Sequence, residues 1–290
     1  MNIDELTRQF GGNGISFEDY HGFPAIRIKN QFSSALISLY GGHVIEFLLP
    51  GHEPVLWMSK ASKFENGAAI RGGVPVCFPW FGAAPEGKSG SHGFVRNTMW
   101  DIDACGITPD GGNFASLIFK CREFELYYTV TAARELTLSL EIYNSGADVL
   151  EFSGALHTYF NISDTENVYV ENLDGLFFMD SVTGDQGVQY GSLVIDREID
   201  RVFRGCGSTR IVDNGFKRTI IVDKYGSDST VIWNPWIEKS KRMPDFGDEE
   251  YHSMLCIEAA KVPKIGDKGL LTEGQLCELR QVIRVVRKDD

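Results

Sequence analysis

The chain has 290 residues, of which 43% are hydrophobic and 23% are charged, an ordinary composition for a protein that buries a core. Its formal net charge of -12 argues against non-specific nucleic-acid binding, which needs a basic face. The same charge repels anions, so a phosphorylated substrate would need a few local cations to overcome that field.

The N-terminus and the cysteines predict where the protein works. The opening MNIDELTRQF lacks a basic region followed by an apolar stretch, so we expect no signal peptide. No apolar run approaches the ~18 residues that a membrane span needs. The six cysteines form no C-x-x-C pair, which favours free buried thiols over disulfides. We therefore expect a cytoplasmic protein without membrane contact.

In chain order, the elements begin with one short helix at Ile3–Phe10, capped by Asn2 or Asp4. Strands dominate after it. Every second residue is apolar in LTLSLEI, which is typical of a strand with one buried face. Thr219–Trp233 resembles a hairpin that turns at Lys224–Asp228. The other predicted strands lie within 35–49 (two strands around a Gly-Gly pair) and at 117–120, 126–131, 136–142, 254–258 and 281–287.

The spacing of the turns predicts the fold class. The 31 glycines and the recurrent Pro-Gly, Gly-Gly and Asn-Gly signals separate short strands. No amphipathic helix lies between strands, which excludes a parallel α/β fold. We expect an all-β protein, a large antiparallel β-sandwich with few short helices, as one domain over 1–290. The charged segment 236–252 is expected to form a loop or short helix near a site.

Two polar residues follow apolar strand residues and look misplaced in a core. His157, flanked by aromatics in LHTYFN, suits a general acid because imidazole titrates near physiological pH. The alternative is a buried histidine bonded to the backbone. Glu258 follows four largely apolar residues, where a carboxylate is costly to bury unless it is paired. It is a candidate general base, or else a strand-end carboxylate that faces water or pairs with Lys261.

A third segment surrounds two arginines with aromatics and prolines. Arg71 opens RGGVPVCFPWFG, and Arg96 lies shortly after it in SHGFVRN. Guanidinium groups suit phosphate because their planar fork donates two hydrogen bonds at once. The paired glycines would let a ligand approach the backbone closely. The alternative is a packed corner of aromatics and prolines with arginines at the surface. The aromatic residues are equally consistent with sugar contact or with core packing; they are Phe78, Trp80, Phe81 and Trp233.

Several other chemistries have no motif in the sequence. A phosphate-binding G-x-x-x-x-G-K-[ST] loop, a dinucleotide-binding glycine pattern and H-E-x-x-H are all lacking. No G-x-S-x-G elbow supports a serine hydrolase. The six histidines lack close ligand spacing, so we expect no metal site.

Together these segments resemble a known family. RGGVPVCFPWFG, SHGFVRN, LHTYFNISD and CIEAA are similar to the motifs of the glucose-6-phosphate 1-epimerases, which are hexose-6-phosphate mutarotases of the aldose 1-epimerase (galactose mutarotase-like) superfamily. ENLDGL, DRVF and WNPW support the match in family order. The resemblance implies an antiparallel β-sandwich without metal or organic cofactor.

The resemblance also implies roles for individual residues. His157 and Glu258 inherit the catalytic positions. Arg71, Arg96 and Asp200 inherit substrate-binding positions, with Asp200 expected on sugar hydroxyls. The HG motif and the residue before it add Ser91 and His92 as expected substrate contacts. Some relatives carry glutamine where Ser91 stands, and serine reaches less far.

The implied reaction is the interconversion of the α and β anomers of glucose 6-phosphate or a related aldohexose 6-phosphate. Glu258 removes the C1 hydroxyl proton while protonated His157 protonates the ring oxygen, and the two charges should stabilise each other if they lie close. The alternatives are a mutarotase of unphosphorylated aldoses, a non-catalytic sugar-binding sandwich and a structural interaction module. We expect a sugar phosphate as the partner, no nucleic acid, and a monomer or weak oligomer.

Overall fold

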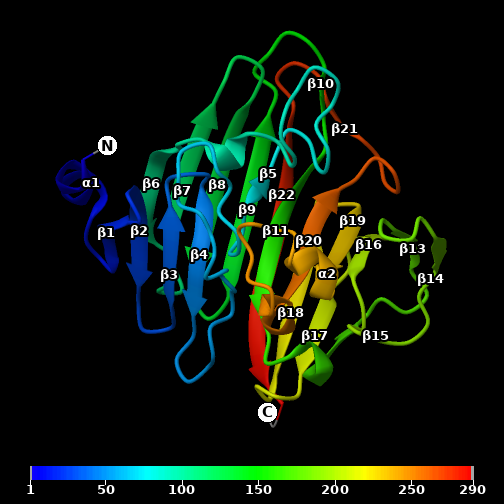
Figure 1. Ribbon diagram of the computed structural model, residues 1–290. Coiled ribbons are helices and arrows are strands. Elements are labelled where there is room, and N and C mark those ends of the chain that lie inside the picture. Colours follow the sequence, from blue (N-terminus) through cyan, green and yellow to red (C-terminus); the bar gives the residue numbers. More distant parts are fainter. Residues whose placement is uncertain (1, 289–290) are drawn as a thin grey trace.

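Two large antiparallel sheets dominate the computed structural model, which describes residues 2–288 (Figure 1). They confirm the predicted all-β class. The nine-stranded sheet has the order β15 (Leu193–Val194), β12 (Val168–Glu171), β17 (Thr209–Asp213), β18 (Arg218–Tyr225), β22 (Leu276–Arg287), β9 (Leu136–Tyr143), β8 (Glu125–Ala132), β7 (Asn113–Lys120), β6 (Asp101–Ile107). The seven-stranded sheet has the order β14 (Gln186–Val188), β13 (Phe177–Asp180), β16 (Ile199–Arg204), β19 (Ser229–Asn234), β20 (Met254–Lys261), β11 (Gly154–Asn161), β5 (Val76–Cys77).

Smaller elements complete the fold. A four-stranded sheet has the order β1 (Ile15–Tyr20), β2 (Phe23–Lys29), β3 (Ser34–Ser38), β4 (His43–Leu48), and β10 (Leu150–Phe152) pairs with β21 (Gly269–Leu271). The α-helices are α1 (Ile3–Phe10) and α2 (Trp236–Ser240), and 3-10 turns lie at Val95–Asn97, Thr165–Asn167 and Glu250–Ser253. The Asn2 side chain accepts the amide of Asp4, which confirms the predicted cap of α1.

The outer strands follow the alternation in the sequence. Buried and less buried residues alternate along β9, so one face packs on the core and the other faces outward. The main hydrophobic cluster includes Leu138 and Ile283 of the nine-stranded sheet and Leu156 and Ile257 of the seven-stranded sheet. Burial of these facing side chains holds the two sheets together.

The predicted hairpin at Thr219–Trp233 is wrong. β18 pairs with β17 and β22, whereas β19 pairs with β16 and β20, so the chain changes sheets at the turn between them. The burial patterns explain the difference. β18 alternates, as an outer strand does, but every residue of β19 is buried. β19 is thus a central strand covered on both faces.

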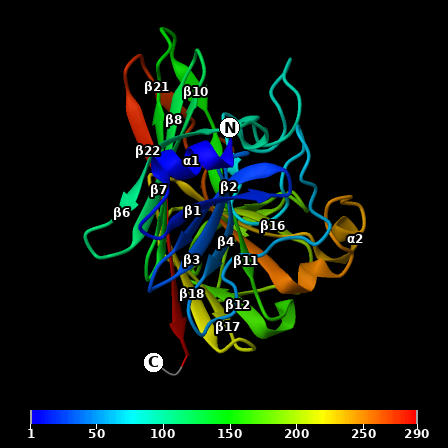
Figure 2. The same ribbon diagram turned by 90° about the vertical axis from the view of Figure 1, so that its left-hand side faces the viewer.

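β11 and β20 are neighbouring inner strands of the seven-stranded sheet and are covered on both faces. Leu156 and Phe160 point into the core between the sheets, and Tyr159 on the other face packs in a second cluster. Trp236 and Met243, from the segment that begins with α2, pack against that second cluster. In Figure 2, α2 lies at the right of the molecule and β22 at the left, with β11 between them.

The remaining expectations concern cysteines and membranes. All six cysteines are free; Cys77 and Cys256 are buried, and the other four are only partly buried. Within residues 2–288, no helix has the length and apolar character required to cross a bilayer.

Candidate active site

His157 and Glu258 lie side by side on neighbouring strands. They are register partners on β11 and β20, and 3.4 Å separates His157 Nε2 from Glu258 Oε1. Both lie inside their strands, not at the strand ends as the sequence suggested. His157 is 7% and Glu258 1% exposed, so their polar groups contribute little to the surface. Lys261, the alternative partner for Glu258, pairs instead with Asp228 at 3.6 Å.

The strand register aligns the pair with other residues on the same face. His157, Glu258, Val231 and Val202 form one row across β11, β20, β19 and β16. The adjacent row contains Tyr159, Cys256, Trp233 and Asp200. Since side chains two residues apart point to the same face of a strand, both rows face the same side of the sheet.

A cavity of about 600 Å³ lies over this face. It is lined by side chains from β11, β16, β19 and β20, by the segment between Arg71 and His92, and by residues after β20. Lys239 of α2 and Met243 complete the wall, so the segment predicted near a site contributes to it. Five of the seven predicted site residues line the cavity: Arg71, His92, His157, Asp200 and Glu258.

Aromatic rings fix the orientation of His157. The Tyr159 ring stacks on the imidazole with centroids 4.7 Å apart and an interplanar angle of 8°. Trp233 meets the imidazole edge-on at 6.1 Å. His157 Nδ1 and Glu258 Oε2 are buried without a hydrogen-bond partner among residues 2–288. Because unpaired buried polar atoms are costly, these two atoms are the ones that a polar ligand would satisfy.

Burial moves the two pKa values away from the charged forms. Burial, and then the charge of Asp200, raise the pKa of Glu258 well above its ordinary value. Burial, and then the electrostatic interactions with His92, Arg71 and Arg96, lower the pKa of His157 well below its ordinary value. From the sequence, we expected an imidazolium at His157 and a carboxylate at Glu258 to stabilise each other. In the structure, the cost of removing these charges from water outweighs that attraction and favours the neutral forms. The neutral pair still carries one transferable proton.

Arg71 is fixed from two sides. Its Nη1 donates to the Tyr159 hydroxyl at 2.8 Å, and its Nη2 donates to Asp245 Oδ2 at 3.0 Å. Burial opposes its charge, but Tyr159 and Asp245 raise its pKa. The glycines that follow have a different role from the one expected. A Cβ on Gly72 would lie 2.5 Å from the Trp57 carbonyl oxygen, so the protein's own backbone makes the close approach there.

Asp200 lies at one end of the cavity beside a lysine that sequence reasoning missed. Lys239 Nζ lies 3.7 Å from Asp200 Oδ2 and 3.1 Å from Glu198 Oε1. Burial raises the pKa of Asp200, and Lys239 opposes that rise. No motif identified Lys239, although the charged segment that contains it had been expected near a site.

Arg96 and Ser91 do not line the cavity. Arg96 is 9% exposed, and its Nη2 donates to the Ser91 carbonyl oxygen at 2.9 Å. His92, between them, does reach the cavity wall. Its Nδ1 accepts the Gly82 amide at 3.3 Å, which leaves Nε2 to carry the proton. Burial and the nearby Arg96 charge lower the pKa of His92 to about 3.

Three of the four aromatics considered in the sequence analysis line the cavity, namely Trp80, Phe81 and Trp233. Phe78 is fully buried in the main core. The sequence could not separate these cases because both environments are apolar.

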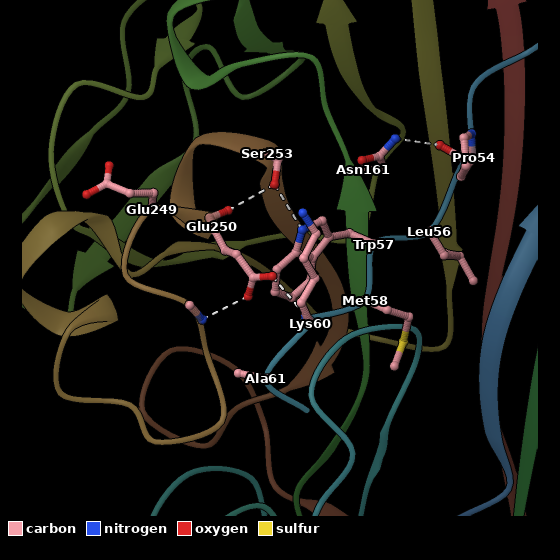
Figure 3. Close-up of a pocket in the computed structure, with 11 residues that line it drawn as sticks. Pro54, Leu56, Trp57, Met58, Lys60, Ala61, Asn161, Glu249, Glu250 and Ser253 are labelled. Carbon is pink, nitrogen blue, oxygen red and sulfur yellow. Dashed lines mark hydrogen bonds between the residues drawn. The ribbon is translucent and has the colours of Figure 1, made fainter. Parts of the chain in front are cut away.

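A second hollow, of about 810 Å³, is lined by Trp57 and its neighbours (Figure 3). Trp57 stacks at 5.8 Å on Tyr159, the same ring that stacks on His157. The polar groups at its centre bond to one another. Glu250 accepts Ser59 Oγ at 2.6 Å, and Ser253 Oγ accepts Trp57 Nε1 at 3.0 Å. The hollow contains neither His157 nor Glu258, so it is not the candidate active site.

Among residues 2–288, no three His, Cys, Asp or Glu side chains are grouped so that they could hold a metal ion. The chemistry that His157 and Glu258 can supply in the cavity is proton transfer by an imidazole and a carboxyl group, beside fixed cations.

The model of the aldose 1-epimerase family matches residues 24–284, a range that contains every residue of the cavity described above. The chain belongs to the aldose 1-epimerase family. As a member of that family it is an isomerase. Similarity to curated and solved members extends over most of its length.

The names of two relatives include a phosphorylated sugar as the substrate. The chain is 36% identical over 250 residues to a proposed glucose-6-phosphate 1-epimerase of Cenchrus ciliaris, covering 79% of this chain and 75% of that one. It is 31% identical over 261 residues to a proposed glucose-6-phosphate 1-epimerase of Escherichia coli, covering 88% and 87%. A crystal structure of a proposed mutarotase from Salmonella typhimurium superposes with a TM-score of 0.88 at 30% identity, covering 95% of both chains.

Proposed function

We propose that this aldose 1-epimerase family member is a hexose-6-phosphate mutarotase, with His157 and Glu258 as its acid and base. The observation that carries the proposal is the pair itself. Imidazole and carboxyl group lie 3.4 Å apart in a cavity of about 600 Å³. Mutarotation needs one proton donor and one proton acceptor near C1 of the sugar, and this pair supplies both.

The reaction proceeds by ring opening. Glu258 takes the proton of the C1 hydroxyl, the C1–O5 bond breaks, and His157 gives a proton to the ring oxygen O5. The open aldehyde rotates about C1–C2. O5 then attacks the other face of C1, returns its proton to His157, and the new C1 oxygen recovers a proton from Glu258. The enzyme ends in its starting protonation state.

The protonation state of the free site is compatible with this cycle. Burial favours protonated Glu258 and neutral His157. One proton transfer across the 3.4 Å between them creates carboxylate and imidazolium, the form in which Glu258 acts as base. The two forms have the same total number of protons and differ only in which residue holds the shared one. They therefore belong to the same titration state of a coupled pair.

Substrate recognition is assigned to the groups around the pair. Arg71 lines the cavity and carries a fixed positive charge, which suits an anionic substrate. Asp200 lies one row away from Glu258, where a carboxylate can accept hydrogen bonds from sugar hydroxyls. Two relatives at 31% and 36% identity are named for glucose 6-phosphate, which supports the phosphorylated sugar as substrate.

Anomer exchange measured by saturation-transfer NMR tests the proposal. We expect the protein to accelerate exchange of glucose 6-phosphate above the buffer rate at low enzyme concentration, and to act much less on glucose. Equal or faster exchange of glucose would indicate a mutarotase of unphosphorylated aldoses. Sugar binding without acceleration would indicate a non-catalytic sugar-binding sandwich.

The expected monomer or weak oligomer stays a prediction. The cytoplasmic location stays a prediction.

A further inference from the structure

Arg71 is held by two segments that lie far apart in the sequence. On one side, its backbone amide donates to Ser62 Oγ at 2.8 Å, and its carbonyl oxygen accepts the Ser59 amide at 3.1 Å. On the other side, Asp245 accepts hydrogen bonds from the Arg71 guanidinium. The place of Arg71 in the cavity therefore depends on how residues 59–62 and 245–247 lie relative to each other.

One carboxylate joins these two segments. Glu250 accepts Ser59 Oγ at 2.6 Å and the Lys60 amide at 2.8 Å from the first segment. It also accepts the Gly247 amide at 2.8 Å, two residues after Asp245 in the second segment. Figure 3 shows the Glu250 side chain between them, in the hollow outside the active-site cavity.

The three hydrogen-bond donors around Glu250 determine which side chain can stand at this position. Each partner offers a hydrogen, so only an acceptor-only group satisfies all of them, and an ionised carboxylate is such a group. The amide of glutamine would present its NH₂ group to at least one N–H or O–H donor. Glutamine has nearly the same shape, so it tests the charge and the acceptor pattern with little change in packing.

We propose that Glu250 is a positioning residue for substrate binding, which acts through Arg71 without touching the substrate. This inference rests on the proposed function only in that Arg71 binds the sugar phosphate. Loss of the Glu250 carboxylate frees Asp245 and the Ser59–Ser62 turn to shift, and a small shift of a binding group has a large effect on affinity.

The test compares Glu250→Gln with Glu249→Gln. Glu249 lines the same hollow but is 77% exposed at its side chain and only approaches His252 at 3.8 Å. We expect Glu250→Gln to raise KM for glucose 6-phosphate about tenfold with kcat within about threefold of wild type, and Glu249→Gln to change neither. In an Arg71→Ala background, Glu250→Gln should raise KM no further, because the group it positions is gone.

Two results would overturn the inference: an unchanged KM in Glu250→Gln, or an equal further increase in the Arg71→Ala background. Calorimetric binding of glucose 6-phosphate gives the same comparison without turnover. If the wild-type protein binds the sugar phosphate but does not accelerate anomer exchange, the proposed function fails while the role of Glu250 is still decided.

A separate observation concerns the charges along the cavity wall. Lys239 faces Glu198 and Asp200, and Arg71 faces Asp245, so each of these two cations has an acidic partner. Lys264 also lines the cavity, and it has no ion-pair or hydrogen-bond partner among residues 2–288. In a chain with a net charge of -12, an uncompensated cation is the group that attracts an anion.

Lys264 lies at the end of the cavity away from Asp200. The Asp200 row crosses β20 at Cys256, before Glu258, whereas Val262 and Lys264 follow β20. The turn that carries Lys264 is anchored. Val262 and Ile265 are buried in one cluster, and Arg204 Nε donates to the Ile265 carbonyl oxygen at 3.1 Å.

We infer that Lys264 is a specificity-determining residue that attracts the phosphate group of the substrate, while the hydroxyl-binding end lies at Asp200. The test measures kcat/KM for glucose 6-phosphate and for glucose in Lys264→Gln. Lys268→Gln is the matched control, since Lys268 lies in the same loop and pairs with Glu151 at 2.5 Å.

We expect Lys264→Gln to lower kcat/KM for glucose 6-phosphate about tenfold, with glucose within about twofold of wild type and the control unchanged. Equal effects on both sugars, or no effect on either, would overturn the role of Lys264. If wild type does not act on glucose 6-phosphate at all, the proposed function fails, and weaker inhibition of glucose exchange by inorganic phosphate in Lys264→Gln would still support an anion site.

Discussion

His157 and Glu258 are register partners on adjacent buried strands, and 3.4 Å separates Nε2 of the imidazole from Oε1 of the carboxyl group. Strand pairing fixes this distance, and the Tyr159 ring fixes the plane of the imidazole. The two proposed proton-transfer groups thus lie on strands, and sites built on strands are held more accurately than sites built on loops.

The first prediction concerns pH. Since burial lowers the pKa of His157 and raises that of Glu258, the one-proton state of the pair extends over a wide range. The kcat/KM profile for anomer exchange should be a broad plateau, with its acid limb below about 6.5, the ordinary histidine value. Glucose should be profiled too, because its rate contains no phosphate titration. An acid limb centred at or above about 6.5 on both sugars would contradict the account, because it would mean that burial does not lower the pKa of His157.

The second prediction concerns Arg96. Its guanidinium is buried behind the cavity wall and lowers the pKa of His92 and His157, so its field reaches the site. Arg96→Ala should raise KM for glucose 6-phosphate several-fold and KM for glucose much less, as steady-state kinetics on both sugars would measure. Equal increases would mean that Arg96 supports the wall mechanically and does not act on the phosphate.

The third prediction concerns stability at low pH. The pKa of His92 is about 3 in the folded protein, against about 6.5 in an unfolded chain. Between these values the unfolded chain binds a proton that the folded protein does not, so His92 makes stability fall as pH falls below about 6.5, by up to about 1.4 kcal/mol per pH unit.

His92→Asn removes this titration, and asparagine tolerates the positive φ of 61° at this position. Urea unfolding between about pH 7.5 and pH 4.5 should therefore show the free energy of unfolding declining less steeply in the variant than in wild type. Parallel declines would show that His92 becomes protonated in the folded protein.

Sequence reasoning singled out His157 and Glu258 as candidates because a histidine and a glutamate stand in otherwise apolar strands, within segments that resemble a family. It misjudged their positions as strand ends, since the buried Ala259-Ala260 and Tyr159-Phe160 continue both strands. It also predicted a hairpin at β18 and β19. Local turn signals cannot tell a hairpin from a change of sheets, which long-range pairing decides.

The groups that sequence reasoning missed come from segments without strand periodicity. Lys239, Asp245 and Glu250 lie in the stretch after β19, and Lys264 lies in the turn after β20. A charged residue in such a stretch is ordinarily solvent-exposed, and only the folded chain shows which ones face Arg71 or the cavity. The acidic composition did indicate that local cations would be needed, but not which ones.

Saturation-transfer NMR on His157→Asn, Glu258→Gln and the double variant tests the central claim most directly. Each single change should lower the anomer-exchange rate of glucose 6-phosphate about 10²–10⁴-fold. The double variant should lose little more than the worse single variant, because the two residues act as one unit. Circular dichroism and unfolding curves for each variant establish that the fold is intact. A near wild-type exchange rate in either folded single variant would contradict the account.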